Sequence, residues 1–299
     1  MEEVTGQLLK TTIDELRRTK QVIVTPDANP SGEPPIFIIG VHRSGTTLVR
    51  LIVDSHPRIA CPPESFFLLG LSRVLEDEKS VEGLAAMGFT EQQVRHQLRE
   101  CASYFFQLYA KSKGKTRWAD KTPSYIDCLP FLDALYGPDC RYLLVFRHGL
   151  DVACSLGDVT PREVKEHVDA CGGDPVAGAA RYWSRQVEKM LAFQREHASR
   201  CFEIRYEQLA TEPEPLLRGA FEFMGEEWDP RVLKFHDQPH DRWIGLEDRK
   251  ASEAKQFVPN IGRYRSQSPD VIRRMLAEAS PMLETLGYVV EQAPESLDP

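Results

Sequence analysis

The stretch PIFIIGVHRSGTTLVRLIVDSHP, residues Pro35–Pro57, joins an apolar run to a glycine turn and then to a helix-like segment. A phosphate-binding loop is built in this order, because the turn directs backbone N–H groups at an anion and the helix N-terminus adds partial positive charge. The pattern G-x-x-x-x-G-K-[ST] nearly fits Gly40–Thr47, but Thr46 stands where the pattern requires lysine. The stretch therefore predicts a phosphate loop without its lysine, unless the turn merely connects a strand to a helix.

Elements on either side of this stretch indicate the fold class. Short apolar runs predict buried strands at Ile36–Ile39, Arg117–Ala119, Tyr142–Phe146 and Phe202–Tyr206. Helix-length segments separate them, at Glu91–Lys111, Ser124–Tyr136 and Val176–His197. Strands that alternate with helices indicate a parallel sheet covered on both faces. We therefore expect an α/β fold, a single P-loop-like domain with a central parallel sheet flanked by helices.

The ends of the chain differ in character from this domain. Apolar residues at helical spacing and a proline-rich linker predict an N-terminal helix and linker over residues 1–35, followed by the domain at 36–290 and a flexible tail at 291–299. Within the domain, Glu226–Arg265 is long, polar and without clear periodicity. Such a segment is typical of a functional lid or binding loop, although undetected secondary structure is the alternative.

Composition excludes several classes of function. The chain has 299 residues, a net charge of −8, and 41% hydrophobic and 27% charged residues, as in an ordinary soluble globular protein. Without a lysine and arginine block it is a poor candidate for binding nucleic acid, and its strand-sized apolar runs predict no membrane span. The seven cysteines are odd in number, scattered and without a C-x-x-C pair, which favours free thiols in a reducing cytoplasm over a metal site. The oligomeric state is not indicated.

The missing lysine bears on which phosphate chemistry the loop serves. In a nucleotide triphosphatase or kinase that lysine reaches the β- and γ-phosphates, and a strand-end aspartate helps to hold Mg²⁺. Here the strand Tyr142–Phe146 runs into Arg147, and Asp120 is the strand-end acid. Positive charge is supplied instead by Arg43 within the loop and by Lys121 after another strand.

The loop HRSGTTL, His42–Leu48, resembles the 5′-phosphosulfate loop of sulfotransferases that use 3′-phosphoadenosine 5′-phosphosulfate (PAPS), in which the turn reads R-S-G-T-T. The resemblance implies that the donor's 5′-phosphate is held by five consecutive residues, Arg43, Ser44, Gly45, Thr46 and Thr47. In that family the loop has no lysine at this position. The resemblance also implies PAPS as the donor and adenosine 3′,5′-bisphosphate (PAP) as the product.

Later motifs extend the resemblance over about Ile36–Arg265. In YLLVFRHGLDVACSL a strand ends at Arg147 and the following helix carries Ser155, which resembles the family's 3′-phosphate site. Arginine suits a terminal phosphate because its planar fork binds two oxygens at once. Tyr206 in IRYEQL resembles the adenine-contacting segment, and NIGRYRS resembles the segment that closes over the 3′-phosphate, which implies roles for Arg263 and Lys255. Taken singly, each residue also fits a helix cap or a surface position.

Sulfonyl transfer to a hydroxyl group requires a base for that hydroxyl and positive charge near the bridging oxygen of the donor. Glu64 in CPPESFF resembles the catalytic glutamate of the protein-tyrosine sulfotransferase-like branch, and Lys121 in ADKTPSY matches its strand-end lysine. Asp120 is then expected to orient its neighbours. The alternatives are that Glu64 caps the next helix, or that a histidine is the base, for which the candidates are His42, His56 and His148.

The sequence thus predicts a cytoplasmic, metal-independent, PAPS-dependent sulfotransferase. Its acceptor is expected to be a hydroxyl group of a small molecule or a carrier-bound intermediate, in a pocket formed by Phe66–Lys115 and Glu226–Asn260. Two rival interpretations remain. One is a P-loop kinase or triphosphatase with a degenerate loop, which would depend on ATP and Mg²⁺. The other is a non-catalytic nucleotide-binding module.

Overall fold

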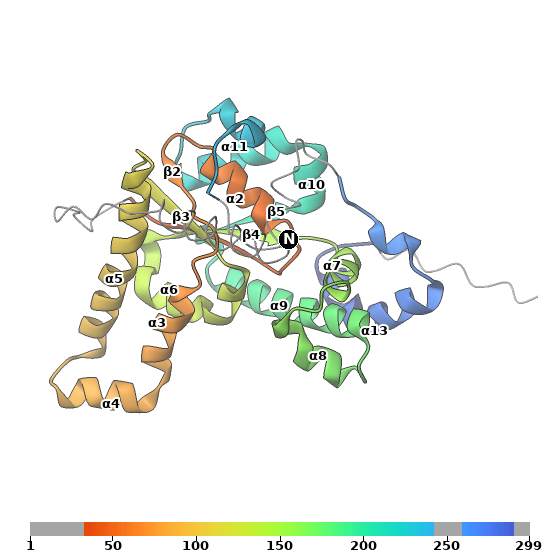
Figure 1. The fold of residues 1–299 in the computed structure, drawn as a ribbon, viewed down its shortest axis with the longest axis horizontal. Coiled ribbons are helices and arrows are strands. Elements are labelled where there is room, and N and C mark those ends of the chain that lie inside the picture. The colour runs from red at the N-terminus through yellow and green to blue at the C-terminus, as the bar shows by residue number, and fades with distance from the viewer. Residues whose placement is uncertain (1–32, 242–258, 290–299) are drawn as a thin grey trace, which may run out of the picture.

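The computed structural model of the protein describes residues 33–241 and 259–289. Within them, five parallel strands form one sheet in the order β2-β3-β1-β4-β5 (Figure 1). The strands are β1 (Ile36–Gly40), β2 (Ile59–Ala60), β3 (Arg117–Lys121), β4 (Arg141–Phe146) and β5 (Cys201–Arg205). The predicted α/β fold with a central parallel sheet is confirmed.

The strands lie where the apolar runs predicted them, within one or two residues at each end. β1 is central, and Ile36 lies opposite Ala119 on one side and Arg141 on the other. β2 was not expected, because two residues are too few to produce a pattern. Tyr206, predicted as the last residue of a strand, instead begins a helix.

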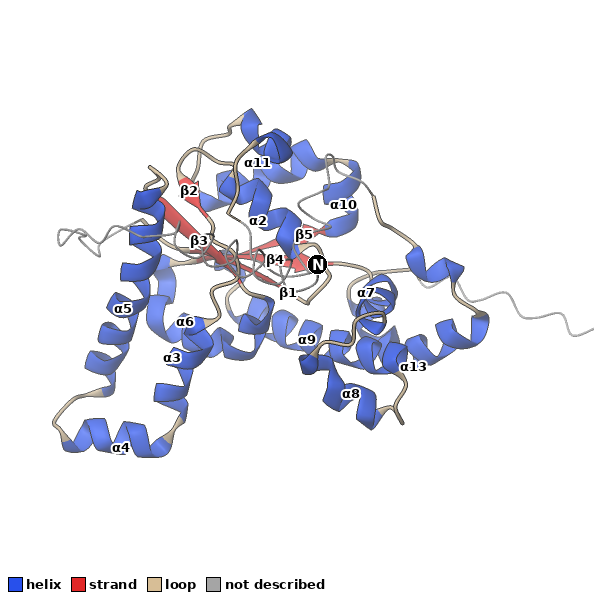
Figure 2. Ribbon diagram, in the orientation of Figure 1, coloured by secondary structure: helices blue, strands red, loops and turns tan. Residues whose placement is uncertain are grey.

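Helices cover both faces of the sheet (Figure 2). On one face, β1 residues such as Ile38 pack with helices of the first layer, which are α2 (Thr46–Asp54), α10 (Tyr206–Thr211) and α11 (Pro213–Met224). On the other face, Phe37 and Ile39 belong to a larger core with helices of the second layer, which are α6 (Leu129–Tyr136), α7 (Gly149–Gly157), α9 (Pro175–Glu196) and α13 (Pro269–Thr285). A short helix, α8 (Lys165–Ala170), packs against α9.

Between β2 and β3 the chain makes a helical arm that extends away from the sheet (Figure 1). It consists of α3 (Phe67–Glu76), α4 (Glu78–Ala86) and α5 (Glu91–Ser112). Thr90 and Gln93 form a capping box at the start of α5, which explains why the predicted helix begins at Glu91. The predicted helix Ser124–Tyr136 is divided into a 3₁₀ segment, Pro123–Cys128, and α6, because Pro130 has no N–H with which to continue one helix.

The segment predicted as a lid is in part fixed to the body. Residues Pro230–Asp237 form 3₁₀ turns that pack on α2, and Val232 and Phe235 are fully buried. Two apolar side chains within four residues therefore anchor this part of the segment to the body, although it shows no helical period. Residues 242–258 of the predicted lid, with Lys255, lie outside the described residues, as do the predicted N-terminal helix and tail. The domain boundaries remain predictions.

None of the helices in the described part of the chain is long and apolar enough to cross a membrane. All seven cysteines are free thiols, and Cys61, Cys128, Cys140 and Cys154 are buried.

Candidate active site

The turn between β1 and α2 depends on its two glycines. A Cβ on Gly40 would lie 2.7 Å from the Thr46 side chain and 2.8 Å from the carbonyl oxygen of Val145. Gly45 has a φ of +99°, a region that favours glycine, and it occupies the N-cap position of α2. Because no side chain caps this helix, its first N–H groups are left for a ligand. The turn therefore has the backbone that an anion-binding loop requires.

On the β4 side of the turn, the structure brings together residues that were predicted to hold the donor. The Nε of Arg43 donates to Ser155 Oγ on α7 at 2.9 Å, and a terminal nitrogen of Arg147 donates to the Arg43 carbonyl oxygen at 2.9 Å. Arg147 is 5% exposed, and its buried Nε has no hydrogen-bond partner among the described residues. Two guanidinium groups are thus held beside the glycine turn, one of them with an unused donor.

Tyr206, predicted to contact adenine, is packed into the same cluster. The guanidinium carbon of Arg147 lies 4.4 Å from the centroid of its ring, and a Cβ on Gly45 would lie 2.5 Å from the ring. The side chain is largely buried, and its hydroxyl accepts the Asn260 N–H at 3.4 Å. Tyr206 therefore supports both the turn and Arg147, and its contact with a base remains a prediction.

Residues Pro259–Ser266, which we name the C-terminal strap, lie next to this cluster. A terminal nitrogen of Arg147 donates to the Asn260 carbonyl oxygen at 2.5 Å. Asp151 on α7 is fully buried, and its two carboxylate oxygens accept the N–H groups of Gly262 at 2.8 Å and of Tyr264 at 3.1 Å. Arg263 forms an ion pair with Asp158, so its guanidinium is not part of the Arg147 cluster. The sequence prediction did not identify Asp151, although an acid in the first turn of a helix is a visible signal.

On the β3 side of the turn, the two predicted catalytic residues meet. Lys121, the last residue of β3, forms an ion pair with Glu64, and its Nζ also lies 3.4 Å from Thr47 Oγ1 in the first turn of α2. The Lys121 side chain is 2% exposed and that of Glu64 is 15% exposed. An amine from a neighbouring strand thus lies beside the loop that lacks its own lysine.

Asp120 faces the other side of the sheet, because successive side chains of a strand alternate. Its Oδ2 accepts a hydrogen bond from Ser65 Oγ at 2.7 Å, and Ser65 Oγ lies 2.7 Å from the hydroxyl of Tyr125. Burial raises the pKa of Asp120 to about 7, although the hydrogen bonds oppose this shift. Sequence reasoning missed Ser65 and Tyr125, since nothing in the sequence shows that they pair with Asp120.

The three histidines considered as bases have structural partners. His42 Nδ1 lies 3.2 Å from the Tyr182 hydroxyl. His56 Nε2 lies 3.0 Å from the Glu227 carbonyl oxygen, beyond the C-terminal end of α2 and so away from the glycine turn. His148 caps α7 and stacks on Tyr264 with ring centroids 4.7 Å apart. Burial lowers the pKa of both His56 and His148.

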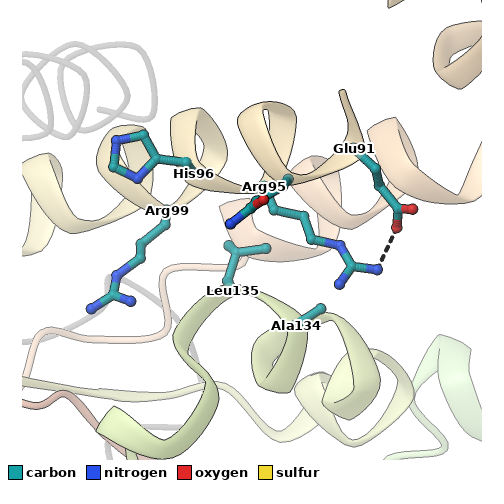
Figure 3. A pocket seen from close by; sticks show the side chains of 7 residues that line it. Glu91, Arg95, His96, Arg99, Ala134 and Leu135 are labelled. Carbon is teal, nitrogen blue, oxygen red and sulfur yellow. Dashed lines mark hydrogen bonds and ion pairs between the residues drawn. The ribbon is translucent and has the colours of Figure 1, made fainter. Parts of the chain in front are cut away.

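A hollow between α5 and α6 is lined in part by the range predicted to form the acceptor pocket, but by none of the residues predicted to bind the donor or to act in catalysis (Figure 3). Arg95 forms an ion pair with Glu91, and Arg99 forms one with Asp139. The positive charges of this hollow are therefore already balanced by neighbouring carboxylates.

Comparisons with known proteins agree with this geometry. A model of the sulfotransferase family matches residues 34–230. The chain is 26% identical over 299 residues to protein-tyrosine sulfotransferase 1 of Danio rerio, covering 96% of this chain and 81% of that protein. It is 28% identical over 230 residues to the nodulation protein NoeE of Sinorhizobium fredii, covering 70% of this chain and 54% of that protein.

The fold is also that of a solved sulfotransferase. The sulfotransferase domain from the Synechococcus PCC 7002 olefin synthase superposes with a TM-score of 0.58 at 21% identity, covering 91% of this chain and all of that domain. Because the family match extends over more than half of the chain and includes β1 to β5, it spans both sides of the glycine turn. The chain belongs to the sulfotransferase family.

Proposed function

We propose that this protein transfers a sulfonyl group from PAPS to a hydroxyl group of a small-molecule or carrier-bound acceptor, with Glu64 as the general base. The observation that carries this proposal is the meeting of Glu64 and Lys121 beside Thr47 at the N-terminus of α2. Sulfonyl transfer requires a base and a positive charge beside an anion-binding site. Glu64 and Lys121 provide the base and the charge, and the N-terminus of α2 provides N–H groups for the anion. The free thiols of the chain favour a cytoplasmic location.

The residues present fit PAPS. When bound, PAPS supplies the sulfonyl group. The Arg43–Thr47 turn would hold the 5′-phosphate, and Arg147 with Ser155 would hold the 3′-phosphate, for which the buried Nε of Arg147 is an unused donor. Tyr206 would contact adenine. Arg263 and Lys255 would close the site, which requires Arg263 to exchange its pairing with Asp158 for the donor.

In the proposed reaction Glu64 accepts the proton of the acceptor hydroxyl, which increases the nucleophilicity of the oxygen. The Lys121 ammonium stabilises the negative charge that develops on the leaving phosphate oxygen, and the N–H groups at the start of α2 act in the same direction. Because Lys121 is buried, water does not screen its charge effectively. The ion pair keeps both side chains in place before the substrates arrive.

The rival interpretations are less well supported by this geometry. A kinase or triphosphatase would use a strand-end carboxylate near the loop to help hold Mg²⁺, whereas Asp120 is directed at Ser65 on the other side of the sheet. A histidine base would have to give up an existing contact: Tyr182 for His42, the α7 cap for His148. A non-catalytic nucleotide-binding module has no need for the Glu64–Lys121 pair.

A thermal-shift comparison of PAP with ATP plus Mg²⁺ tests donor binding. We expect PAP to raise the melting temperature without metal, because a ligand at about 100 times its Kd stabilises a protein by about 2.7 kcal/mol. A shift with ATP and Mg²⁺ alone would favour a kinase. Turnover is then tested by screening hydroxyl compounds with labelled PAPS, and PAP binding without transfer to any hydroxyl compound would favour the binding module.

A further inference from the structure

The consecutive residues Glu64 and Ser65 bond to two consecutive residues at the end of β3, Lys121 and Asp120. Glu64 forms an ion pair with Lys121, and the next residue, Ser65, donates its hydroxyl to Asp120 at 2.7 Å. The Ser65 N–H also donates to Thr122 Oγ1 at 3.2 Å. Asp120 and Lys121 face opposite sides of the sheet, because successive side chains of a strand alternate. Glu64 and Ser65 therefore contact β3 on its two opposite faces. The position of Glu64 is therefore set by its neighbour as well as by its own ion pair.

The contact of Ser65 with Asp120 is part of a buried chain of hydrogen bonds. The Ser65 hydroxyl has a single proton, so when it donates to Asp120 it must accept from the Tyr125 hydroxyl, which lies 2.7 Å away. Tyr125 and Asp120 are both fully buried. A hydroxyl held between two buried partners has little freedom, and a connected chain of this kind resists displacement.

The backbone directly after Ser65 is strained. Phe66 has a φ of +56°, which is unusual for a bulky residue, and it begins α3 at the N-cap position. Such a conformation costs of the order of 1–3 kcal/mol and persists only where the surroundings determine it. The hydrogen bonds of Ser65 provide that restraint at the residue immediately before the strain.

We infer that Asp120, Ser65 and Tyr125 form a positioning network that holds the Glu64 carboxylate on Lys121 beside the first turn of α2. This inference rests on the proposed function for the catalytic meaning of Glu64. The proposed role of the three residues is to position Glu64 rather than to bind substrate or donor. They act through the backbone of residues 64–65, which ties the loop before α3 to the end of β3.

Ser65→Ala tests the network because it removes both side-chain hydrogen bonds with the smallest change in volume. We expect kcat to fall by about 10- to 100-fold, since a misplacement of about 1 Å at a reacting group has effects of that size. The Kd for PAP should change by less than about twofold, because the glycine turn and Arg147 are untouched. Ser65→Thr keeps the hydroxyl and should restore most of kcat. Ser72→Ala is the matched control, a buried serine of α3 whose hydroxyl bonds, within the described residues, to the Leu69 carbonyl oxygen alone.

A double-mutant cycle with Glu64 distinguishes a loss of kcat caused by a displaced Glu64 carboxylate from one caused by a general loss of stability. In a double-mutant cycle, Ser65→Ala should reduce kcat much less in the Glu64→Gln background than in the wild type, because both act through the same carboxylate. The urea midpoints of the same four proteins should be non-additive as well. Additive effects in either measurement, or equal losses of kcat in Ser65→Ala and Ser72→Ala, would overturn the inference.

The two proposals fail in distinguishable ways. If the wild-type protein neither binds PAP nor transfers the label, the proposed function fails. The urea midpoints need no substrate, so they still decide the inference: non-additive midpoints support the network and additive midpoints refute it.

Discussion

Glu64 and Lys121 are 57 positions apart in the sequence and form an ion pair at the carboxyl end of β3. The lysine also lies beside Thr47, so a single amine connects the proposed base to the phosphate loop. A residue with two contacts of this kind affects both ground-state binding and turnover. A residue that contacts only the proposed base is expected to affect turnover, and a residue that contacts only the loop is expected to affect nucleotide binding. The predictions for individual side chains follow from this difference.

Glu64→Gln should separate binding from chemistry. Glutamine keeps the size of the side chain but cannot accept a proton, so we expect turnover to fall by about 10²- to 10⁴-fold while PAP affinity persists. Steady-state kinetics with an acceptor found by screening and calorimetry with PAP are the measurements. Glu78→Gln, at an exposed position of α4, is the control. Near-wild-type turnover in Glu64→Gln, with an inactive His42 variant that still binds PAP, would show that the base has been misassigned.

Arg147→Ala should discriminate between nucleotides. Its buried guanidinium is the proposed ligand of the 3′-phosphate, and charged hydrogen bonds contribute roughly 1.5–3 kcal/mol each. We therefore expect PAP affinity to fall by at least about tenfold, and affinity for adenosine 5′-phosphate to fall much less. Titration calorimetry with both nucleotides measures this difference. Arg141→Ala, at the other end of β4, is the matched control, and an equal loss for both ligands in Arg147→Ala would refute the assigned role.

Among the elements, α7 organises the proposed donor side of the site. It follows β4 directly after Arg147 and carries Asp151 and Ser155 four positions apart, which places them on one face of the helix. Asp151 holds the backbone of the C-terminal strap, and Ser155 holds Arg43 of the glycine turn. One short helix thus connects two segments that are more than 200 positions apart in the chain.

Asp151→Ala should loosen the C-terminal strap. The substitution leaves the N–H groups of Gly262 and Tyr264 without their acceptors, so we expect both amides to exchange faster and the free energy of unfolding to fall by roughly 3 kcal/mol. PAP affinity should also fall, because the strap supplies the Asn260 carbonyl oxygen that holds Arg147. Hydrogen exchange by mass spectrometry is the measurement, with Asp169→Ala on α8 as the control. Unchanged protection of the strap would show that α7 does not hold it.

At the scale of the whole molecule, the site lies where the two helical layers meet the carboxyl ends of β1, β3 and β4. In parallel sheets ligands bind at this edge, because the loops there connect strands to helix N-termini. The first layer contributes α2 and the second contributes α7, while the arm of α3 to α5 begins right after Glu64 and Ser65. Burial at this edge also places Asp120 wholly inside the fold.

The buried Asp120 should make stability depend on pH. Burial raises its pKa from the ordinary 3.8 to about 7, so the folded protein keeps a proton that the unfolded chain releases. Its contribution to stability is full below about pH 4 and is lost as the pH rises through 7. Asp120→Asn has no such proton, so the free energy of unfolding of the variant relative to the wild type should rise by up to about 4 kcal/mol between about pH 4 and pH 8. Urea denaturation across this range measures the difference, and a constant difference would contradict a buried neutral carboxyl group.

Local signals in the sequence were enough to determine the class of fold and the position of the glycine turn after β1. The strands are short apolar runs, and the turn at Gly40 and Gly45 requires residues that can be recognised one at a time. Lys121 and Arg147 were predicted as site residues because the strand-end motifs that contain them resemble motifs of the sulfotransferase family. The motif surrounding each of them is contiguous in the chain, so no tertiary information was needed to find it.

Tertiary structure alone decided which of these residues touch one another. The pairing of Glu64 and Ser65 with Lys121 and Asp120, and that of Asp151 with the strap, join segments that are far apart in the sequence, and such pairing leaves no periodic pattern. The anchoring of Val232 and Phe235 on α2 was missed for the same reason, because 3₁₀ turns in a polar segment show no helical period. Sequence patterns report local conformation and the direction of burial, whereas a site is made by contacts that form only when the sheet has brought its strand ends together.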